Sequence, residues 1–293
     1  MIRRTVVPAV VLALVYLSVS YYIADSALDA EANPLEESPG DFALDYEDAE
    51  FSPRGWPDIT LRGWWMPARD PQGVVIRTHG IDSTRSSMLG MVPALVTNGY
   101  SVLAFDLRGH GESDHAQMGA GIHESDDLLG AVDYVIRERG ARPGTIFLHG
   151  NSYGGAIVLM AGWREPAVVG VFADSAFATL SDLVVQEVAR RTSAPSWLAS
   201  ALRPGVVLMA RLTRGVDVGS VRPAEDAARY PYAIGLAHCD IDDRIPISHL
   251  HRIRSQLRHP PQVTVYEGCA HGDAWDDYPS SYEENLLNYL GSR

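Results

Sequence analysis

Short apolar runs alternate with helix-like segments along most of this chain, and this alternation most constrains its fold. The runs occupy residues 74–78, 101–105, 145–149, 168–172, 232–237 and 262–266. Helical patterns between many of them predict βαβ crossovers and a mostly parallel α/β sheet. Near-continuous Val, Ile, Leu and Phe content is typical of strands buried on both faces. Two further runs, at 42–51 and 59–66, have turn signals between them and predict an opening antiparallel pair.

The clearest candidate for chemistry follows the run at 145–149. The segment Gly150–Gly154 (GNSYG) places Ser152 in a G-x-S-x-G pattern between a predicted strand and a predicted helix. Ligand crevices of parallel sheets lie beyond the carboxyl ends of the strands, where Ser152 falls. The glycines are needed because side chains in so tight a turn would collide with neighbouring backbone. We therefore expect Ser152 to be a nucleophile; the alternative is a residue that only caps the helix.

A serine nucleophile needs a base, and position decides among the 10 histidines. His271 stands in a turn-like segment between the last predicted strand and the last predicted helix, which makes it our candidate. Structural roles are expected for three histidines in loops or at strand ends: His110, His149 and His238. Surface positions are expected for three on or near a polar helix: His249, His251 and His259.

An acid must orient the base and stabilise its charged form. The turn after the run at 232–237 offers Asp240, Asp242 and Asp243. Asp174, after the run at 168–172, is a rival; otherwise it is a structural residue near the site. The residues alone leave these candidates open.

Residues from about 63 to 290 resemble the α/β-hydrolase superfamily, in particular its serine aminopeptidase-like and esterase-like bacterial branch. Besides the serine motif, the resemblance includes the segments 105–113 (FDLRGHGES) and 174–177 (DSAF). The segment 238–246 (HCDIDDRIP) is similar to the family's H-G-x-x-D-x-x-V-P pattern, which implies Asp242 as the acid. Asp243 is then a solvent-facing neighbour and Asp240 a turn former. The order serine, aspartate, histidine is also the family's order.

The same resemblance implies an oxyanion hole of two backbone N–H groups. One comes from the residue after the nucleophile, which is Tyr153. The other comes from the loop after residues 74–78, where His79 and Gly80 resemble the family's His-Gly pair and Ile81 is the implied donor. The alternative is that His79 and Gly80 form a simple turn.

Cys239 and Cys269, the only cysteines, depart from the family pattern. Both follow adjacent predicted strands, and they flank the acid and histidine segments. A disulfide between them is our hypothesis for an exported domain. The alternative is a pair of unrelated small buried residues.

Residues 175–231 form an insertion that we expect to be a helical cap, broken by Pro195, Pro204 and Gly205. In this fold such insertions cover the pocket. Its apolar residues are expected either to line an acyl site or to form the buried face of two short helices. They are Trp197, Leu198, Leu202, Val206, Val207, Leu208 and Met209.

The N-terminal segment is apolar: residues 5–24 carry no charge, Arg3 and Arg4 precede them, and Asp25 follows. Twenty helical residues match a bilayer core of roughly 30 Å, and the arginines favour the cytoplasmic side. Residues 1–24 therefore predict a single-pass anchor with an extracytoplasmic domain at 41–293, joined by an acidic solvated linker at 25–40. The alternatives are a signal peptide, cleaved near residues 18–20 or 30–32 and giving a secreted protein, or a buried core helix.

A net charge of −13 makes nucleic acid an unsuitable partner. No metal or organic cofactor is expected. The sequence predicts a serine hydrolase that cleaves a small-molecule carboxylic ester, or less readily an amide or thioester. The alternatives are an aminopeptidase-like peptidase and a catalytically silent binding module at the membrane.

Overall fold

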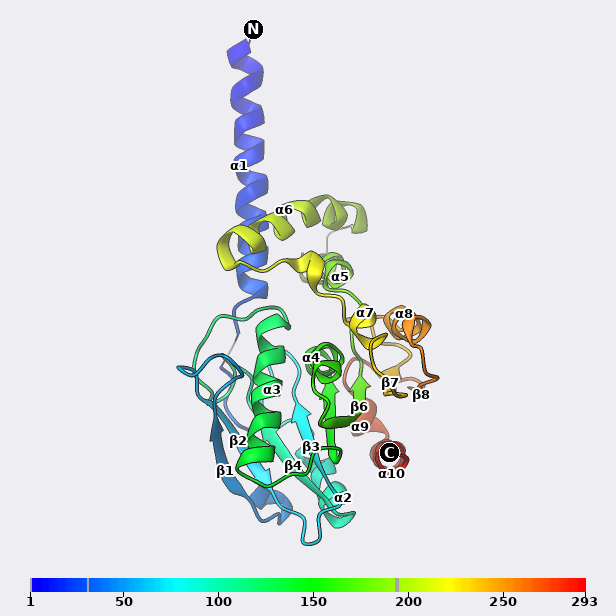
Figure 1. Ribbon diagram of the computed structural model, residues 1–293. Helices are drawn as coiled ribbons and strands as arrows, with labels where there is room; N and C mark the ends of the chain where they lie inside the picture. The colour runs from blue at the N-terminus through cyan, green and yellow to red at the C-terminus, as the bar shows by residue number, and fades with distance from the viewer. Residues whose placement is uncertain (1, 31, 193–194) are drawn as a thin grey trace.

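A computed structural model describes residues 2–30, 32–192 and 195–293 and contains an eight-stranded sheet of order β1-β2-β4-β3-β5-β6-β7-β8 (Figure 1). The strands are β1 (Glu47–Phe51), β2 (Leu61–Met66), β3 (Gly73–Thr78), β4 (Tyr100–Phe105), β5 (Ile146–Asn151), β6 (Val168–Asp174), β7 (Gly235–Cys239) and β8 (Gln262–Tyr266). β2 runs antiparallel to both β1 and β4, and all other neighbours are parallel. The predicted sheet with its opening antiparallel pair is confirmed.

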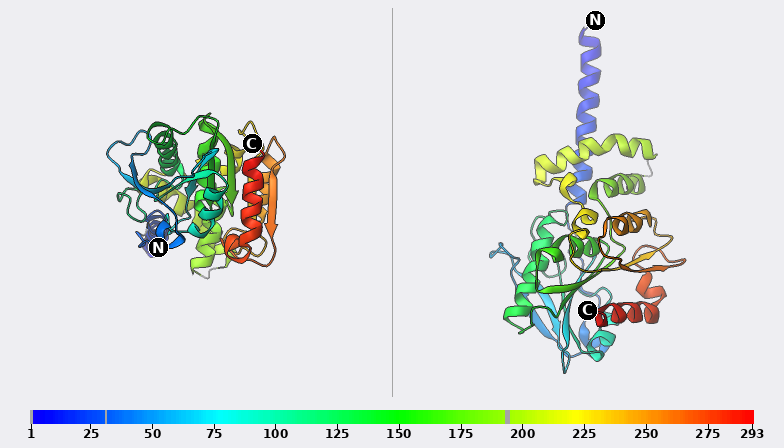
Figure 2. Two further views of the ribbon diagram at one scale, coloured as in Figure 1. Left: turned by 90° about the horizontal axis from the view of Figure 1, so that it is seen from below. Right: turned by 45° about the vertical axis from the view of Figure 1, so that its right-hand side comes forward.

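Helices cover both faces of the sheet (Figure 2). One face packs against α3 (Ile122–Arg137), α4 (Tyr153–Ala161), α7 (Pro223–Ala227) and α8 (Ser248–Gln256). The other packs against α2 (Val92–Thr97), α9 (Ala274–Asp277) and α10 (Pro279–Gly291). In α10 the buried residues Tyr282, Leu286 and Tyr289 recur at helical spacing, so one stripe of the helix faces the sheet.

Strand register places the functional loops at one edge. Thr78 pairs with Gly150, Asn151 with Asp174, and Asp174 in turn with Ala237. The carboxyl ends of β3, β5, β6 and β7 are therefore level, and the loops that follow them meet above the sheet.

Two helical segments of the fold are short. Between β3 and β4 the chain contains only the helices η2 (Leu89–Met91) and α2. After β8 the helical segment is divided into α9 and α10, because Pro279 stands at the first position of α10, which suits a helix start and not an interior.

The cap insertion contains α5 (Leu180–Thr192), α6 (Ser196–Arg214), η4 (Val218–Ser220) and α7. The prediction that Pro204 and Gly205 break a helix is wrong, because α6 continues through both. Tyr16 contributes to this continuity. Its hydroxyl accepts a hydrogen bond from Gly205 N–H at 2.9 Å and donates one to Ala201 O at 3.0 Å. These contacts lie next to Pro204, which has no N–H and therefore interrupts the backbone hydrogen bonds of the helix.

Tyr16 belongs to α1 (Ile2–Ala27), which crosses α6 and extends away from the domain (Figures 1 and 2). Its segment Val7–Ala27 is long and apolar enough to cross a membrane by length and composition. The acidic segment that follows is partly exposed and is attached to the domain. Asn33 donates to Asp82 O at 2.7 Å, Ser86 donates to Glu37 O at 3.0 Å, and η1 (Pro39–Phe42) leads into β1.

Candidate active site

Ser152 occupies a strained turn between β5 and α4, with φ 54° and ψ −117°. The flanking glycines are required by space. A Cβ atom at Gly150 would lie 2.3 Å from Gly154 O, and one at Gly154 would lie 2.1 Å from Thr78 O. Although Ser152 stands at the N-cap of α4, its side chain makes no capping hydrogen bond. The capping alternative for this serine is therefore wrong.

The Ser152 hydroxyl instead meets His271. The distance from Ser152 Oγ to His271 Nε2 is 2.7 Å, and from His271 Nδ1 to Asp242 Oδ2 it is 2.6 Å. A carboxylate only accepts hydrogen bonds, so Nδ1–H donates to Asp242 and Nε2 accepts from the serine hydroxyl. The structure thus brings together the three residues that the sequence singled out.

Asp242 is held rigidly for this contact. Its side chain is buried, and its Oδ1 accepts the backbone N–H groups of Arg244 at 3.0 Å and Ile245 at 2.7 Å. His238 lies on the inner side, with Nε2 at 2.7 Å from Ile245 O and 3.7 Å from Asp242 Oδ2. These contacts leave Oδ2 directed at the imidazole.

Asp174, the rival acid, lies beneath the nucleophile. Its backbone carbonyl accepts the N–H of Ser152 at 2.8 Å, and its carboxyl group accepts the hydroxyls of Ser175 at 3.0 Å and Tyr282 at 3.1 Å. Burial raises the pKa of this carboxyl, against the hydrogen bond from Ser175 that lowers it. This arrangement fits the structural alternative for Asp174.

A disulfide joins Cys239 to Cys269, which confirms the hypothesis that these residues pair. It connects the end of β7, just before the loop of Asp242, to the turn after β8, just before His271. Asp240 strengthens the same connection, because its Oδ1 accepts the backbone N–H of Gly268 at 2.6 Å. The acid loop and the histidine loop are therefore fixed to each other covalently and by hydrogen bonding.

The loop after β3 is positioned by His79. Its Nε2 accepts the N–H of Leu107 at 3.0 Å, so Nδ1 carries the proton and donates to Gly80 O at 2.7 Å. Burial lowers the pKa of His79 to about 3, and the ring stays neutral. These contacts connect the loops after β3 and β4 and bring Ile81 to the same cavity wall as Ser152 and Tyr153.

The loop after β4 is held by two buried ion pairs. Arg85 Nη1 lies 2.6 Å from Asp106 Oδ2, and Arg108 Nη2 lies 2.5 Å from Asp127 Oδ1. This loop contains His110, which is buried with its Nδ1 at 3.0 Å from Arg108 O, as a structural role requires.

A cavity of about 350 Å³ opens at Ser152. Its walls are mainly apolar and come from loop residues such as Met118 and Phe177 and from the cap helices α5 and α6. The C-terminal part of α1 and the residue after it also line the cavity, between Tyr22 and Leu28. The sequence had suggested no such role for these residues, since their apolar character is shared with any membrane or signal segment.

Two further expectations need correction. His249 is 3% exposed and not at the surface, because its Nδ1 accepts Ala178 N–H at 3.0 Å and its Nε2 faces Gln186 Oε1 at 3.1 Å. Of the cap residues weighed for an acyl site, Val206 lines the cavity. Trp197, Leu198 and Leu208 are exposed, and neither alternative for the cap accounts for these three.

Within the described residues, no group of three or more His, Cys, Asp and Glu side chains is placed to hold a metal ion.

Sheet order, a serine on the turn after β5, and a histidine and aspartate on later loops place this chain among the α/β-hydrolase serine hydrolases. The family model described as serine aminopeptidase, S33, matches residues 69–231. This match covers more than half of the chain, and the chain belongs to that family.

The chain is also similar to individual proteins. It is 23% identical to YqkD of Bacillus subtilis over 232 residues, covering 78% of this chain and 75% of the relative. It is 25% identical to YfhR of Escherichia coli O157:H7 over 253 residues, covering 83% and 80%. Its fold matches the Pyrococcus furiosus esterase Pf2001 with a TM-score of 0.70 and 20% identity, over 90% of this chain and 98% of the esterase.

Proposed function

We propose that this chain hydrolyses carboxylic esters, with Ser152 as nucleophile, His271 as base and Asp242 as the acid that orients the base. The observation that carries the proposal is the continuous hydrogen-bond chain from Ser152 Oγ through both nitrogens of His271 to Asp242. These hydrogen bonds begin at Ser152, which lines an apolar cavity large enough for a small or medium substrate.

In the first half-reaction, Ser152 Oγ attacks the ester carbonyl while His271 Nε2 takes the hydroxyl proton. Asp242 stabilises the resulting imidazolium through Nδ1–H. As the tetrahedral intermediate collapses, the bond to the alcohol oxygen breaks and His271 returns the proton to it. The alcohol leaves, and the acyl group remains on Ser152.

In the second half-reaction, His271 takes a proton from a water molecule, which attacks the acyl carbonyl. The bond to Ser152 Oγ then breaks, the serine recovers its proton, and the carboxylic acid leaves. No oxidant, reductant or metal takes part in either step.

The backbone N–H groups of Ile81 and Tyr153 are the proposed oxyanion donors. Three features support them: both residues line the cavity beside Ser152, Tyr153 opens α4, and His79 fixes the loop that carries Ile81. A helix N-terminus also directs its positive dipole end toward the developing charge.

Hydrolysis of aminoacyl amides is a second candidate. The family name refers to aminopeptidases, and two charged residues, Glu187 and Arg244, line the cavity at Ser152. A mainly apolar cavity with few polar groups favours the ester.

Labelling with a fluorophosphonate probe tests the nucleophile. The wild type and a Ser220→Ala control, altered at an exposed serine of η4, should be labelled, whereas Ser152→Ala should not. An unlabelled wild type would support the silent binding module. Rates on p-nitrophenyl butyrate and on aminoacyl p-nitroanilides then separate the esterase from the peptidase.

We also propose that α1 anchors the chain in a membrane, with Arg3 and Arg4 on the cytoplasmic side. The hydrogen bonds between Tyr16 and α6 support retention of α1, since cleavage near residues 18–20 would remove them. N-terminal sequencing of the mature protein tests this: a sequence that starts after residue 18 contradicts the anchor.

A further inference from the structure

Helix α6 presents an apolar stripe on the side that faces away from the domain. Its members recur at spacings of four, three, four and four residues: Trp197, Ala201, Pro204, Leu208 and Leu212. All five are exposed, Trp197 by 69% and Leu212 by 68%. Val206 and Ala210, on the opposite face, are buried. Three of the five, Trp197, Leu208 and Leu212, are large, and such a row of exposed apolar side chains marks a contact with a membrane or another apolar partner.

The stripe lies where α1 crosses α6, and the two helices are closely joined there. Besides the Tyr16 hydrogen bonds, a Cβ atom at Gly205 would lie only 2.2 Å from Ser20 Oγ, so the backbone of α6 lies tightly against α1. Arg214 Nη2, at the end of α6, lies 2.6 Å from Asp25 Oδ1, at the end of α1. The orientation of α1 therefore also fixes the orientation of α6.

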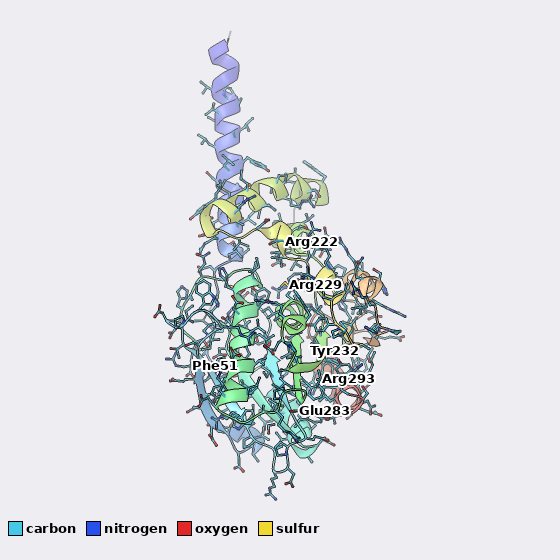
Figure 3. All side chains as sticks on the ribbon, viewed as in Figure 1. Phe51, Arg222, Arg229, Tyr232, Glu283 and Arg293 are labelled. Atoms are coloured by element: carbon cyan, nitrogen blue, oxygen red, sulfur yellow. A yellow bond between two sulfur atoms is a disulfide. The ribbon has the colours of Figure 1, made fainter. Side chains whose placement is uncertain are left out.

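The length of α1 beyond this crossing is too short to span a bilayer. From Thr5, where the charge-free segment begins, to Tyr16 is a distance of about 17 Å at a rise of 1.5 Å per residue. A bilayer core is about 30 Å thick. Residues 7–15 of this part of α1 are all exposed and stand clear of the rest of the protein (Figure 3), and Val7, Leu12 and Leu14 are more than half exposed. A bilayer that α1 crosses must therefore extend past Tyr16 and include α6.

The cavity at Ser152 lies immediately on the domain side of this crossing. Residues 22–24 and 26–28, at and just after the end of α1, form one wall, and Val206 and Ala210 of α6 contribute to another. The helix face opposite the apolar stripe thus lines the cavity that contains the nucleophile. Only the width of α6 separates the outward stripe from the substrate cavity.

We propose that α6 lies in the bilayer leaflet next to the catalytic domain and that the cavity receives the acyl chain of a lipid ester from that leaflet. The second part rests on the proposed ester hydrolysis at Ser152. An acyl chain that leaves the leaflet for this cavity exchanges one apolar environment for another, so little apolar surface meets water on the way. The products are an alcohol and a fatty acid, formed by the two half-reactions described above.

Two esters that share the same leaving group test the substrate class. Both are assayed with the full-length protein in phosphatidylcholine vesicles. p-Nitrophenyl palmitate is held in the bilayer, and p-nitrophenyl butyrate is dissolved in water. Leu208→Glu/Leu212→Glu places two carboxylates in the stripe and should lower palmitate hydrolysis by about tenfold or more, because charges are excluded from the leaflet. Butyrate hydrolysis should stay within about twofold, since neither leucine lines the cavity.

Val265→Glu is the matched control. Val265 is an exposed apolar residue of β8, remote from α6, and its replacement should change neither rate. Equal palmitate rates for the stripe variant and the wild type contradict the proposal. A wild type that hydrolyses butyrate but not palmitate overturns the lipid substrate and leaves ester hydrolysis standing.

A measurement independent of catalysis tests the placement of α6. Phosphatidylcholine brominated along its acyl chains should quench a component of the wild-type tryptophan fluorescence, and Trp197→Phe should lose that component. If Trp197→Phe leaves the quenching unchanged, α6 lies outside the leaflet and the proposal is overturned, whether or not the wild type hydrolyses either ester. A wild type that hydrolyses neither ester would separately refute the proposed function.

Discussion

The hydroxyl of Tyr16 accepts a hydrogen bond from the backbone N–H of Gly205 at 2.9 Å, so the N-terminal helix completes a turn of the cap helix. The preceding residue, Pro204, has no N–H to donate, and a helix is weakest at such a position. By also donating to Ala201 O, the same hydroxyl joins both members of an i, i+4 pair. α1 therefore stabilises α6 as well as crossing it.

Tyr16→Phe should destabilise the cap. Loss of the hydroxyl removes two hydrogen bonds beside Pro204, which costs about 1 kcal/mol and lowers Tm by about 2–4 °C in a chain of this size. Thermal unfolding in detergent micelles measures the change. Tyr21→Phe, at a 45% exposed tyrosine of the same helix, is the control and should leave Tm unchanged. Identical Tm values for the two variants would show that the Tyr16 contact contributes nothing.

Asp242→Asn should lower kcat for p-nitrophenyl butyrate by about 10⁴-fold, because the amide no longer holds the required tautomer of His271 or stabilises its charge. Asp174→Asn should lower kcat by less than about tenfold, since its carboxyl group contacts Ser175 and Tyr282 and an amide can retain polar contacts there. The reverse order of losses would make Asp174 the acid.

The site was predictable where a local steric rule governs it. The glycines around Ser152 predict a strand–turn–helix, because any larger residue at Gly150 or Gly154 would clash with neighbouring backbone. Position along the chain then indicated His271. Asp242 was different: three aspartates share its turn, and only a family resemblance separated them. The structure distinguishes them by burial, since Asp242 is enclosed while Asp240 and Asp243 are exposed.

The cap was less predictable because its structure depends on distant partners. Pro204 and Gly205 indicate a helix break, and nothing local reveals that Tyr16, 189 residues away from Gly205, supplies hydrogen bonds there. The burial of His249 also depends on distant residues and could not be predicted from its local sequence. It stands on a polar helix, yet Ala178 and Gln186 from the cap side enclose it. Contacts between segments far apart in sequence leave no periodic pattern.

Reduction of the Cys239–Cys269 disulfide should lower the free energy of unfolding. The bond closes a segment with a sequence separation of 30, for which the chain-entropy relation gives about 3–4 kcal/mol. Urea unfolding with and without reductant measures this loss. Cys239→Ser/Cys269→Ser should match the reduced wild type and show no response to reductant. A wild type that is equally stable in both conditions would contradict the prediction.

Arg108→Met should destabilise the fold by about 3–5 kcal/mol, because it leaves the Asp127 carboxylate buried without its partner. Arg108→Met/Asp127→Leu should recover part of this loss. Arg222 provides the contrast: it lies at the cap (Figure 3) and pairs with Glu225 while about half exposed. Arg222→Met should therefore leave urea unfolding nearly unchanged, because an exposed ion pair contributes little to stability. Similar costs at the two sites would refute the assigned role of burial.

Acid should destabilise the fold through His249, which lies beside the cap. Burial lowers its pKa to about 4, although nearby Asp182 acts in the opposite direction. The unfolded chain, with a histidine pKa near 6.5, binds more protons than the folded chain between about pH 4 and 6.5. Stability contributed by the neutral ring is therefore complete above about pH 6.5 and decreases as the pH falls, by about 2–3 kcal/mol at pH 4.

His249→Asn removes this titration while an amide oxygen can still accept the Ala178 N–H. Its free energy of unfolding should decrease less steeply than that of the wild type between pH 6.5 and 4, as measured by urea unfolding across that range. His251→Asn is the control, because it makes the same replacement at an exposed histidine of the same helix. The difference between the two variants isolates the His249 ring from the other buried histidines, including His79 and His149, whose pKa values burial also lowers in the folded chain. Parallel pH profiles for all three proteins would show that folding does not lower the pKa of His249, contrary to its burial between Ala178 and Gln186.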